Sequence, residues 1–117
     1  MDKTNKEQIK QAVYDVVSLI PHGRATSYGA IAKAIGFPAL SRMVGKVMSQ
    51  CDSSVTRIPA HRVVNNQGFL SGSQAFGDSG EMQKLLKSEG VVVVNNKIKN
   101  WKSVFWNPLE EIKLSEL

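Results

Sequence analysis

The stretch that decides the fold runs from Thr26 to Gln50 and reads TSYGAIAKAIGFPALSRMVGKVMSQ. Its first part predicts a short helix that Thr26 or Ser27 can cap and that Gly36 ends. The apolar residues on one side of this helix are Tyr28, Ile31, Ala32 and Ile35. Residues 37–39 form a tight connection that leads into a second helix.

The second predicted helix, roughly Leu40 to Gln50, has two different faces. Its apolar residues recur at helical spacing and are Leu40, Val44, Val47 and Met48. The other face is polar, basic or small, and consists of Ser41, Arg42, Gly45, Lys46 and Ser49. Two short helices, a brief turn and a face of this kind are typical of a DNA-binding helix-turn-helix motif.

Gly45 lies on the polar face of this second helix. Glycine inside a helix costs about 1 kcal/mol relative to alanine, and packing on an exposed face does not offset that cost. A close approach by another backbone, such as a DNA strand, would explain the glycine. A glycine that is merely tolerated would need no partner, and the sequence alone leaves both interpretations open.

The composition is that of a folded domain with a basic centre. The chain has 117 residues, of which 42% are hydrophobic and 21% charged, and this predicts a single domain over residues 1–117. The formal net charge is +5, and the segment from Arg24 to Arg62 holds six basic residues against one acid, Asp52. Such a segment suits a polyanion such as nucleic acid, although a solvated basic surface without a partner has the same composition.

Cysteine usage and hydropathy exclude several classes of protein. The single cysteine, Cys51, excludes an intrachain disulfide and a zinc site of clustered cysteines, and we expect neither a metal nor a cofactor. No apolar run approaches the roughly 18 residues of a membrane span, and the N-terminus lacks the apolar core of a signal peptide. We therefore expect an intracellular protein without a membrane partner.

The flanking segments predict further helices and a hairpin. Residues 4–19 predict a helix, and its apolar stripe consists of Ile9, Val13, Val16, Val17 and Ile20. Residues 51–57 and 69–77 predict loops, 65–68 a turn, and 78–89 a helix closed by Gly90. Residues 91–94 and 97–101 predict a hairpin, and the tail is expected to pack through its aromatic residues and to fray after Pro108. The predicted fold class is mostly α with a small β component.

The segment Ile58-Pro59-Ala60-His61-Arg62-Val63-Val64 has the layout of an active site with alanine at the reacting position. It resembles the Pro-Cys-His-Arg-Val motif of O6-alkylguanine-DNA alkyltransferases, in which the cysteine removes an alkyl group from a flipped guanine. The resemblance runs from about Ile9 to Gly90, and its other motifs are Ser27-Tyr28, Ser41-Arg42-Met43-Val44-Gly45 and Glu89-Gly90. Since Ala60 has no nucleophilic atom, transfer cannot occur there.

A short chain without this cysteine is similar to the alkyltransferase-like proteins, which bind O6-alkylguanine in DNA and pass the lesion to nucleotide excision repair. The resemblance implies a winged-helix-like helix-turn-helix domain whose helix from Leu40 enters the minor groove. Arg42 would fill the gap left by the extruded base, and Tyr28 would crowd the phosphate beside it. The DNA-binding residues implied in this way are Tyr28, Ser41, Arg42, Gly45 and Lys46.

The resemblance also implies a lesion pocket, formed by Tyr28, Pro59, Ala60, His61 and Ser71. In the transferases, the residues matching His61 and Glu89 activate the cysteine through water. Here both are expected to be structural and to satisfy each other. Arg62 is expected to brace the loop by bonding backbone carbonyls, and Asn65 to tie the recognition helix to the site loop. Because many relatives have tryptophan in place of Ala60, we expect bulky adducts to be tolerated as well as methyl.

These observations predict a monomeric, non-enzymatic sensor whose partners are DNA containing O6-alkylguanine and nucleotide excision repair proteins. It would be cytoplasmic and nucleoid-associated in a bacterium, or nuclear in a eukaryote. One alternative is a methyltransferase inactivated by replacement of its cysteine with alanine at position 60. Others are a helix-turn-helix transcription regulator and an active enzyme with Cys51 as its nucleophile. Residues 71–74, Ser-Gly-Ser-Gln, lack the basic residue of some relatives, which predicts weaker discrimination against normal guanine.

Overall fold

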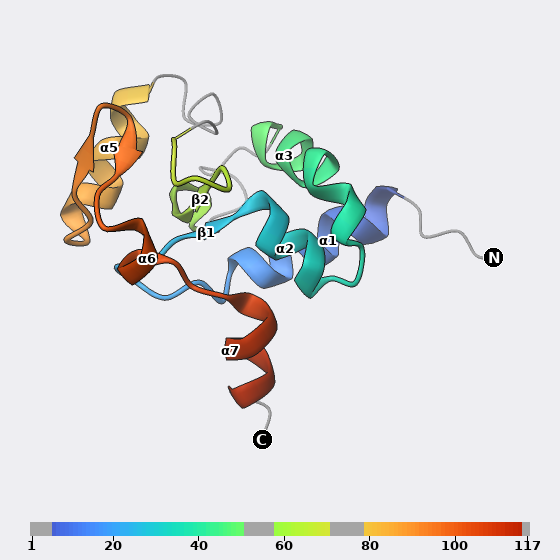
Figure 1. Cartoon of the computed structure of the whole chain (residues 1–117). Coiled ribbons are helices and arrows are strands. Elements are labelled where there is room, and N and C mark those ends of the chain that lie inside the picture. Colours follow the sequence, from blue (N-terminus) through green and yellow to red (C-terminus); the bar gives the residue numbers. More distant parts are fainter. Residues whose placement is uncertain (1–5, 51–57, 71–78, 116–117) are drawn as a thin grey trace.

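The computed structural model describes residues 6–50, 58–70 and 79–115. The helices and strands in this part of the chain are α1 (Lys6–Val17), β1 (Thr26–Ser27), α2 (Tyr28–Ala34), η1 (Pro38–Leu40), α3 (Ser41–Ser49), η2 (Ala60–Arg62), β2 (Val63–Val64), α5 (Ser79–Ser88), β3 (Val93–Val94), β4 (Lys97–Ile98), α6 (Trp101–Val104) and α7 (Pro108–Ser115). Helices dominate, and the strands form two small sheets (Figure 1). The predicted fold class is confirmed.

The predicted helix pair is α2 and α3. Ser27 caps α2, since its Oγ accepts a hydrogen bond from the Ala30 N–H at 3.1 Å. The connection contains the 3₁₀ turn η1, so α3 begins at Ser41, one residue later than predicted. Both helices pack against α1, whose apolar stripe lies in the main core (Figure 1). The fully buried residues of this core include Val13, Val17, Ile31 and Val44.

A short parallel pairing joins the helix pair to the segment that carries Ala60. Strand β1 pairs with β2 in the register Thr26↔Val63 and Ser27↔Val64. Helix α2 follows β1 directly, and the turn η2 directly precedes β2. The pairing therefore places the start of α2 beside the predicted lesion pocket, although the two segments are far apart in the sequence.

The C-terminal part contains a second, smaller core. It lies between α5, the hairpin and β2, and its fully buried residues include Val64, Leu70, Met82, Leu86 and Ile98. Strands β3 and β4 form the predicted antiparallel hairpin, but they are shorter than predicted, and Trp101 begins α6 instead of ending a strand. The turn residues Asn95 and Asn96 have φ of 52° and 65°, and asparagine adopts this left-handed conformation more readily than most residues.

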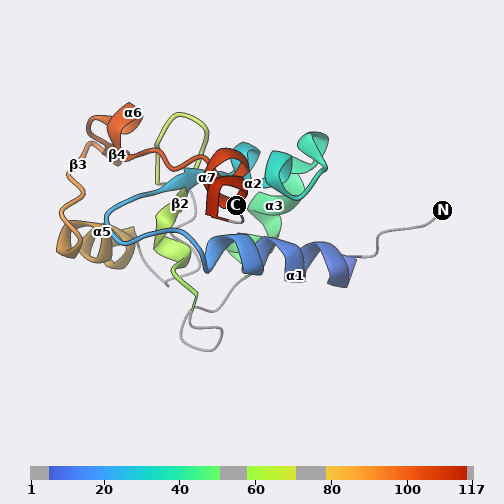
Figure 2. The same cartoon turned by 90° about the horizontal axis from the view of Figure 1, so that it is seen from below.

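The prediction that the tail frays after Pro108 is wrong, because α7 begins at that proline. Proline is favoured in the first turn of a helix, where its missing N–H costs nothing. The side chain of Asn107 accepts a hydrogen bond from the Leu109 N–H at 3.2 Å and so caps the helix. Helix α7 packs against α2 (Figure 2), and the buried Trp106 confirms that the tail packs through its aromatic residues.

Candidate nucleic-acid interface

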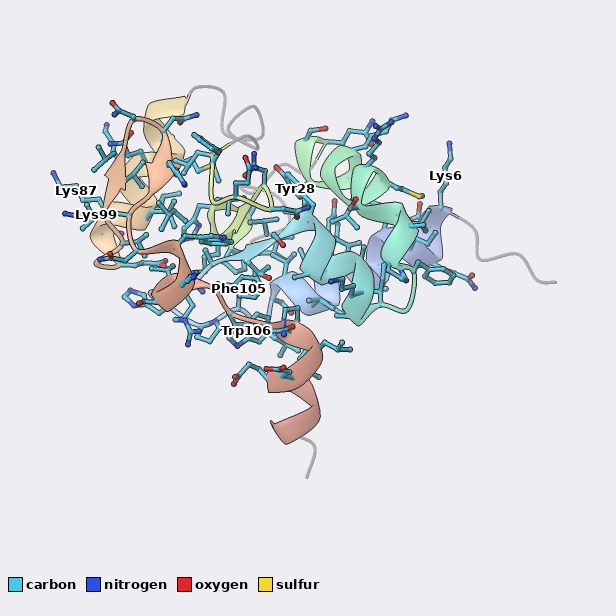
Figure 3. All side chains as sticks on the ribbon, in the orientation of Figure 1. Lys6, Tyr28, Lys87, Lys99, Phe105 and Trp106 are labelled. Atoms are coloured by element: carbon cyan, nitrogen blue, oxygen red, sulfur yellow. The ribbon has the colours of Figure 1, made fainter. Side chains whose placement is uncertain are left out.

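Helix α3 presents its basic residues to solvent. Arg42 and Lys46 are exposed and lie one turn apart, while Ser41 and Gly45 are half-buried. Tyr28, at the start of α2, lies next to Gly45 (Figure 3). The structure therefore brings all five predicted DNA-binding residues to α3 and the adjoining start of α2.

The protein's own packing does not require glycine at position 45. A Cβ atom added there would lie 3.8 Å from Cδ2 of Tyr28, which is ordinary van der Waals contact. The residue is helical, so it needs no left-handed backbone conformation. Among the described residues, nothing prevents a side chain at this position, and the cost of glycine in the helix is left without an internal compensation.

The segment with alanine at the reacting position forms the turn η2. Ala60 is 4% exposed and packs in the main core, His61 is also buried, and Pro59 is half-buried. The side chain of Ala60 consists of Cβ alone, which offers neither a nucleophile nor a hydrogen-bonding group. Ser71, the remaining residue of the predicted lesion pocket, lies outside the described residues, as does Cys51.

Glu89 is the centre of a polar network behind this turn. Its Oε2 lies 2.7 Å from Nε2 of His61 and accepts a hydrogen bond from Nη2 of Arg62 at 2.6 Å. Its Oε1 accepts hydrogen bonds from Nε of Arg62 and from the Gly23 N–H, both at 3.0 Å. Arg62 also donates from Nη1 to the Ile20 carbonyl at 2.7 Å. The network joins η2, the C-terminal end of α5 and the chain after α1.

This network agrees with the structural roles expected for His61 and Glu89, which contact each other directly. Arg62 bonds a backbone carbonyl, as expected, but its main partner is the Glu89 carboxylate, which sequence reasoning did not identify. An arginine and a glutamate 27 residues apart give no local signal of such a pair.

The network also sets the protonation states of Glu89 and His61. Burial by itself would raise the pKa of Glu89, but hydrogen bonds from Arg62, His61 and Gly23 outweigh it and lower this pKa to about 2. Burial lowers the pKa of His61 from 6.5, against the opposing effect of Glu89. At neutral pH the carboxylate is therefore ionised and the imidazole neutral. Since an ionised carboxylate only accepts hydrogen bonds, Nε2 of His61 carries the proton.

The predicted role of Asn65 as a link to the recognition helix is not what its side chain does in the structure. Its Oδ1 accepts hydrogen bonds from the N–H groups of Gln67 and Phe69, both at 2.9 Å, and so closes its own turn. The neighbouring Asn66 reaches the helix pair instead, because its Oδ1 accepts from the Gly29 N–H of α2 at 3.1 Å. A Cβ at position 29 would lie 2.9 Å from this oxygen, so a larger residue there would displace the Asn66 side chain.

Two of the basic residues in the central segment stabilise the fold. Arg24 donates hydrogen bonds to the carbonyls of Val104 and Phe105, and Arg62 belongs to the Glu89 network. Lys33, Arg42 and Lys46 are exposed. Among the described basic residues of the central segment, those that remain exposed therefore lie on α2 and α3.

Within residues 6–50, 58–70 and 79–115, no group of three or more His, Cys, Asp or Glu residues could hold a metal ion. No helix within them is long and apolar enough to cross a membrane.

The helix pair, the buried turn η2 and the Glu89 network together define a DNA-binding domain of the alkyltransferase type. Residues 8–91 match the family model described as 6-O-methylguanine DNA methyltransferase, DNA binding domain. The structure is also similar to a crystal structure of S. pombe Atl1 in complex with damaged DNA containing O6-carboxymethylguanine. The TM-score is 0.77, with 30% sequence identity over 91% of this chain and 98% of that chain.

Two relatives identify the branch of this family. Alkyltransferase-like protein 1 of Schizosaccharomyces pombe is 32% identical over 100 residues, which are 82% of this chain and 92% of the relative. The DNA base-flipping protein of Escherichia coli is 35% identical over 107 residues, which are 91% of this chain and 81% of the relative. The chain belongs to the alkyltransferase-like family.

Proposed function

We propose that this protein is a DNA-damage sensor that binds O6-alkylguanine in duplex DNA, rotates the base out of the helix and leaves the alkyl group in place. The observation that carries the proposal is Ala60, which occupies the reacting position on a buried turn beside the His61–Glu89 pair. The surroundings of an alkyl-transfer site are kept while the atom that would accept the alkyl group is absent. The named relatives, a base-flipping protein and Atl1 bound to damaged DNA, support the same function.

Each residue of the interface has a part in this function. Helix α3 enters the minor groove, where the exposed guanidinium of Arg42 stacks into the gap left by the extruded base. Tyr28 stands next to α3 and crowds the phosphate of the target nucleotide, which favours rotation of that nucleotide. Ser41 and Lys46 contact phosphates, and Gly45 lets the DNA backbone approach the helix closely.

The flipped base enters a pocket beside Tyr28, Pro59, Ala60 and His61. The neutral His61, held by Glu89, has no thiol to deprotonate, so it shapes the pocket wall and takes no proton. The bound complex persists until nucleotide excision repair proteins take over the lesion, since no reaction ends it. We propose that the protein acts as a monomer inside the cell, where its DNA substrate lies.

A direct test compares the affinity of the protein for two duplexes that differ only in having O6-methylguanine or guanine at one position. The mass of the recovered protein is then measured by mass spectrometry. We expect tighter binding to the lesion and an unchanged protein mass, because transfer would add the alkyl group permanently. Equal affinity for the two duplexes would overturn lesion sensing. A mass gain, on Cys51 or elsewhere, would establish an enzyme, and a dominant preference for one base sequence would favour a transcription regulator.

A further inference from the structure

A cleft of about 470 Å³ lies between α1 and α3 and carries basic residues from both helices. Lys6 and Lys10 are one turn apart on α1, and Arg42 and Lys46 are one turn apart on α3. The other lining residues are Glu7, Met43, Val47 and Gln50. Residues four apart lie on one face of a helix with Cβ atoms about 5–6 Å apart, so two basic pairs border the same cleft.

Among the described residues that line this cleft, basic side chains outnumber carboxylates by four to one. Glu7 is the one carboxylate among the lining residues, and all four basic side chains are exposed. The ion pairs of the Glu89 network do not involve them. Like charges gathered at one place repel each other, and this cost is recovered when a polyanion binds.

The cleft is continuous with the DNA-binding face of α3, since Arg42 and Lys46 belong to both. Lys6 extends from the first turn of α1 on the side of the molecule where α3 lies (Figure 3). Nζ of Lys10 lies 5.8 Å from the ring centroid of Tyr14, and this cation–π contact orients the Lys10 side chain along α1. A duplex held by α3 therefore passes next to a second helix that offers two lysines.

We propose that the DNA-binding surface extends from α3 onto α1, and that Lys6 and Lys10 bind backbone phosphates of the duplex beside the lesion. The inference rests on the DNA binding proposed above and adds a second, lesion-independent contact to it. Lysine ammonium groups on flexible stems suit phosphates as point charges, and they read no base edges. The two lysines strengthen binding to any duplex without contributing to the preference for O6-alkylguanine.

The test measures affinity against salt concentration for wild type, for Lys6→Gln/Lys10→Gln and for a matched control. The control is Lys87→Gln/Lys99→Gln, which removes the same charge from exposed positions on α5 and next to β4, at the opposite end of the molecule from Lys6 (Figure 3). Each lost phosphate contact lowers the slope of log affinity against log salt by about 0.9. Between 50 and 200 mM salt, the affinity of wild type should therefore fall by a factor about 12 times larger than the affinity of the variant that lacks two contacts. The control should keep the wild-type slope.

Several outcomes separate the possibilities. The proposal is supported if Lys6→Gln/Lys10→Gln loses affinity equally for methylated and plain duplexes and if Lys6→Arg/Lys10→Arg keeps the wild-type slope. It is overturned if the variant has the wild-type slope, if the control loses as much, or if only lesion preference falls. Equal thermal unfolding of the variants and wild type excludes misfolding as the cause. A wild type without lesion preference would contradict the sensor function and leave the slope comparison valid.

Discussion

Arg62 and Glu89, 27 residues apart in the sequence, form a two-point ion pair in which Nε lies 3.0 Å from Oε1 and Nη2 lies 2.6 Å from Oε2. The side chains are 15% and 7% exposed, so the pair is largely removed from water. In this chain the pair joins the turn that carries Ala60 to the end of α5. Its contribution is to stability and to the position of the turn η2.

Replacing Glu89 with glutamine is expected to destabilise the protein strongly. The change leaves the Arg62 charge buried without its partner, and breaking one side of a buried pair costs roughly 3 kcal/mol or more. Urea unfolding measures the loss. Glu110→Gln, an exposed change on α7, serves as the control and should lie within about 0.5 kcal/mol of wild type. A loss no larger than that of the control would contradict the structural role of the network.

Acid is expected to destabilise the protein in two stages. The pKa of His61 is lowered, so the unfolded state takes up a proton first and stability begins to fall below pH 6.5. The pKa of Glu89 falls from 4.5 to about 2, so its contribution, roughly 3 kcal/mol, is complete above pH 4.5 and is lost as pH falls toward 2. Urea unfolding at a series of pH values tests this, and Glu89→Gln should lack the second stage.

Gly45→Ala is expected to raise the stability of the protein and to lower its affinity for DNA. The added Cβ meets Tyr28 at an ordinary contact distance, so stability should rise by up to about 1 kcal/mol. Affinity for DNA should fall, because the methyl group keeps the DNA backbone away from α3. Gly29→Ala is the contrasting variant, since its Cβ would lie 2.9 Å from Oδ1 of Asn66 and would displace that exposed side chain. The lost hydrogen bond to the Gly29 N–H should offset the gain in helix propensity, so stability should rise less than in Gly45→Ala. Unchanged DNA affinity in Gly45→Ala would show that the glycine is merely tolerated.

Arg42→Ala and Lys46→Ala are expected to act on different quantities. In the proposed complex Arg42 fills the space of the flipped base, so its loss should remove most of the preference for O6-methylguanine over guanine. Lys46 is proposed to contact phosphate, so its loss should weaken binding to both duplexes about equally and lower the salt slope by about 0.9. Titration of both duplexes measures the two effects. The assigned roles would be wrong if the variants behaved alike.

Larger O6-alkyl groups are expected to bind about as well as methyl. In the proposed lesion pocket, the small side chain of Ala60 takes up less space than an indole side chain would, so the pocket should accept a longer alkyl chain. A series of duplexes carrying methyl and progressively larger O6 adducts tests this expectation. A steep fall in affinity after methyl would contradict it.

Local patterns were sufficient for much of this fold. The helix pair, its Ser27 cap, the hairpin at Asn95-Asn96 and the apolar stripe of α1 each depend on residues close together in the sequence. The motif with Ala60 pointed to the family for the same reason, because its residues are consecutive. The helix α7 differs from the prediction although Asn107 and Pro108 form a recognisable helix start, because proline breaks the interior of a helix but is favoured in its first turn.

The amino-acid sequence by itself determined that the chain has a helix-turn-helix with a basic face and no nucleophile at position 60. Only the tertiary structure decided which distant groups contact each other: β1 with β2, Arg62 with Glu89, and Asn66 with Gly29. It also decided that the lysines of α1 border the same cleft as the basic residues of α3. These contacts arise when the cores form and bring remote segments together. No spacing along the chain specifies them, because their partners are set by packing and burial across the whole domain.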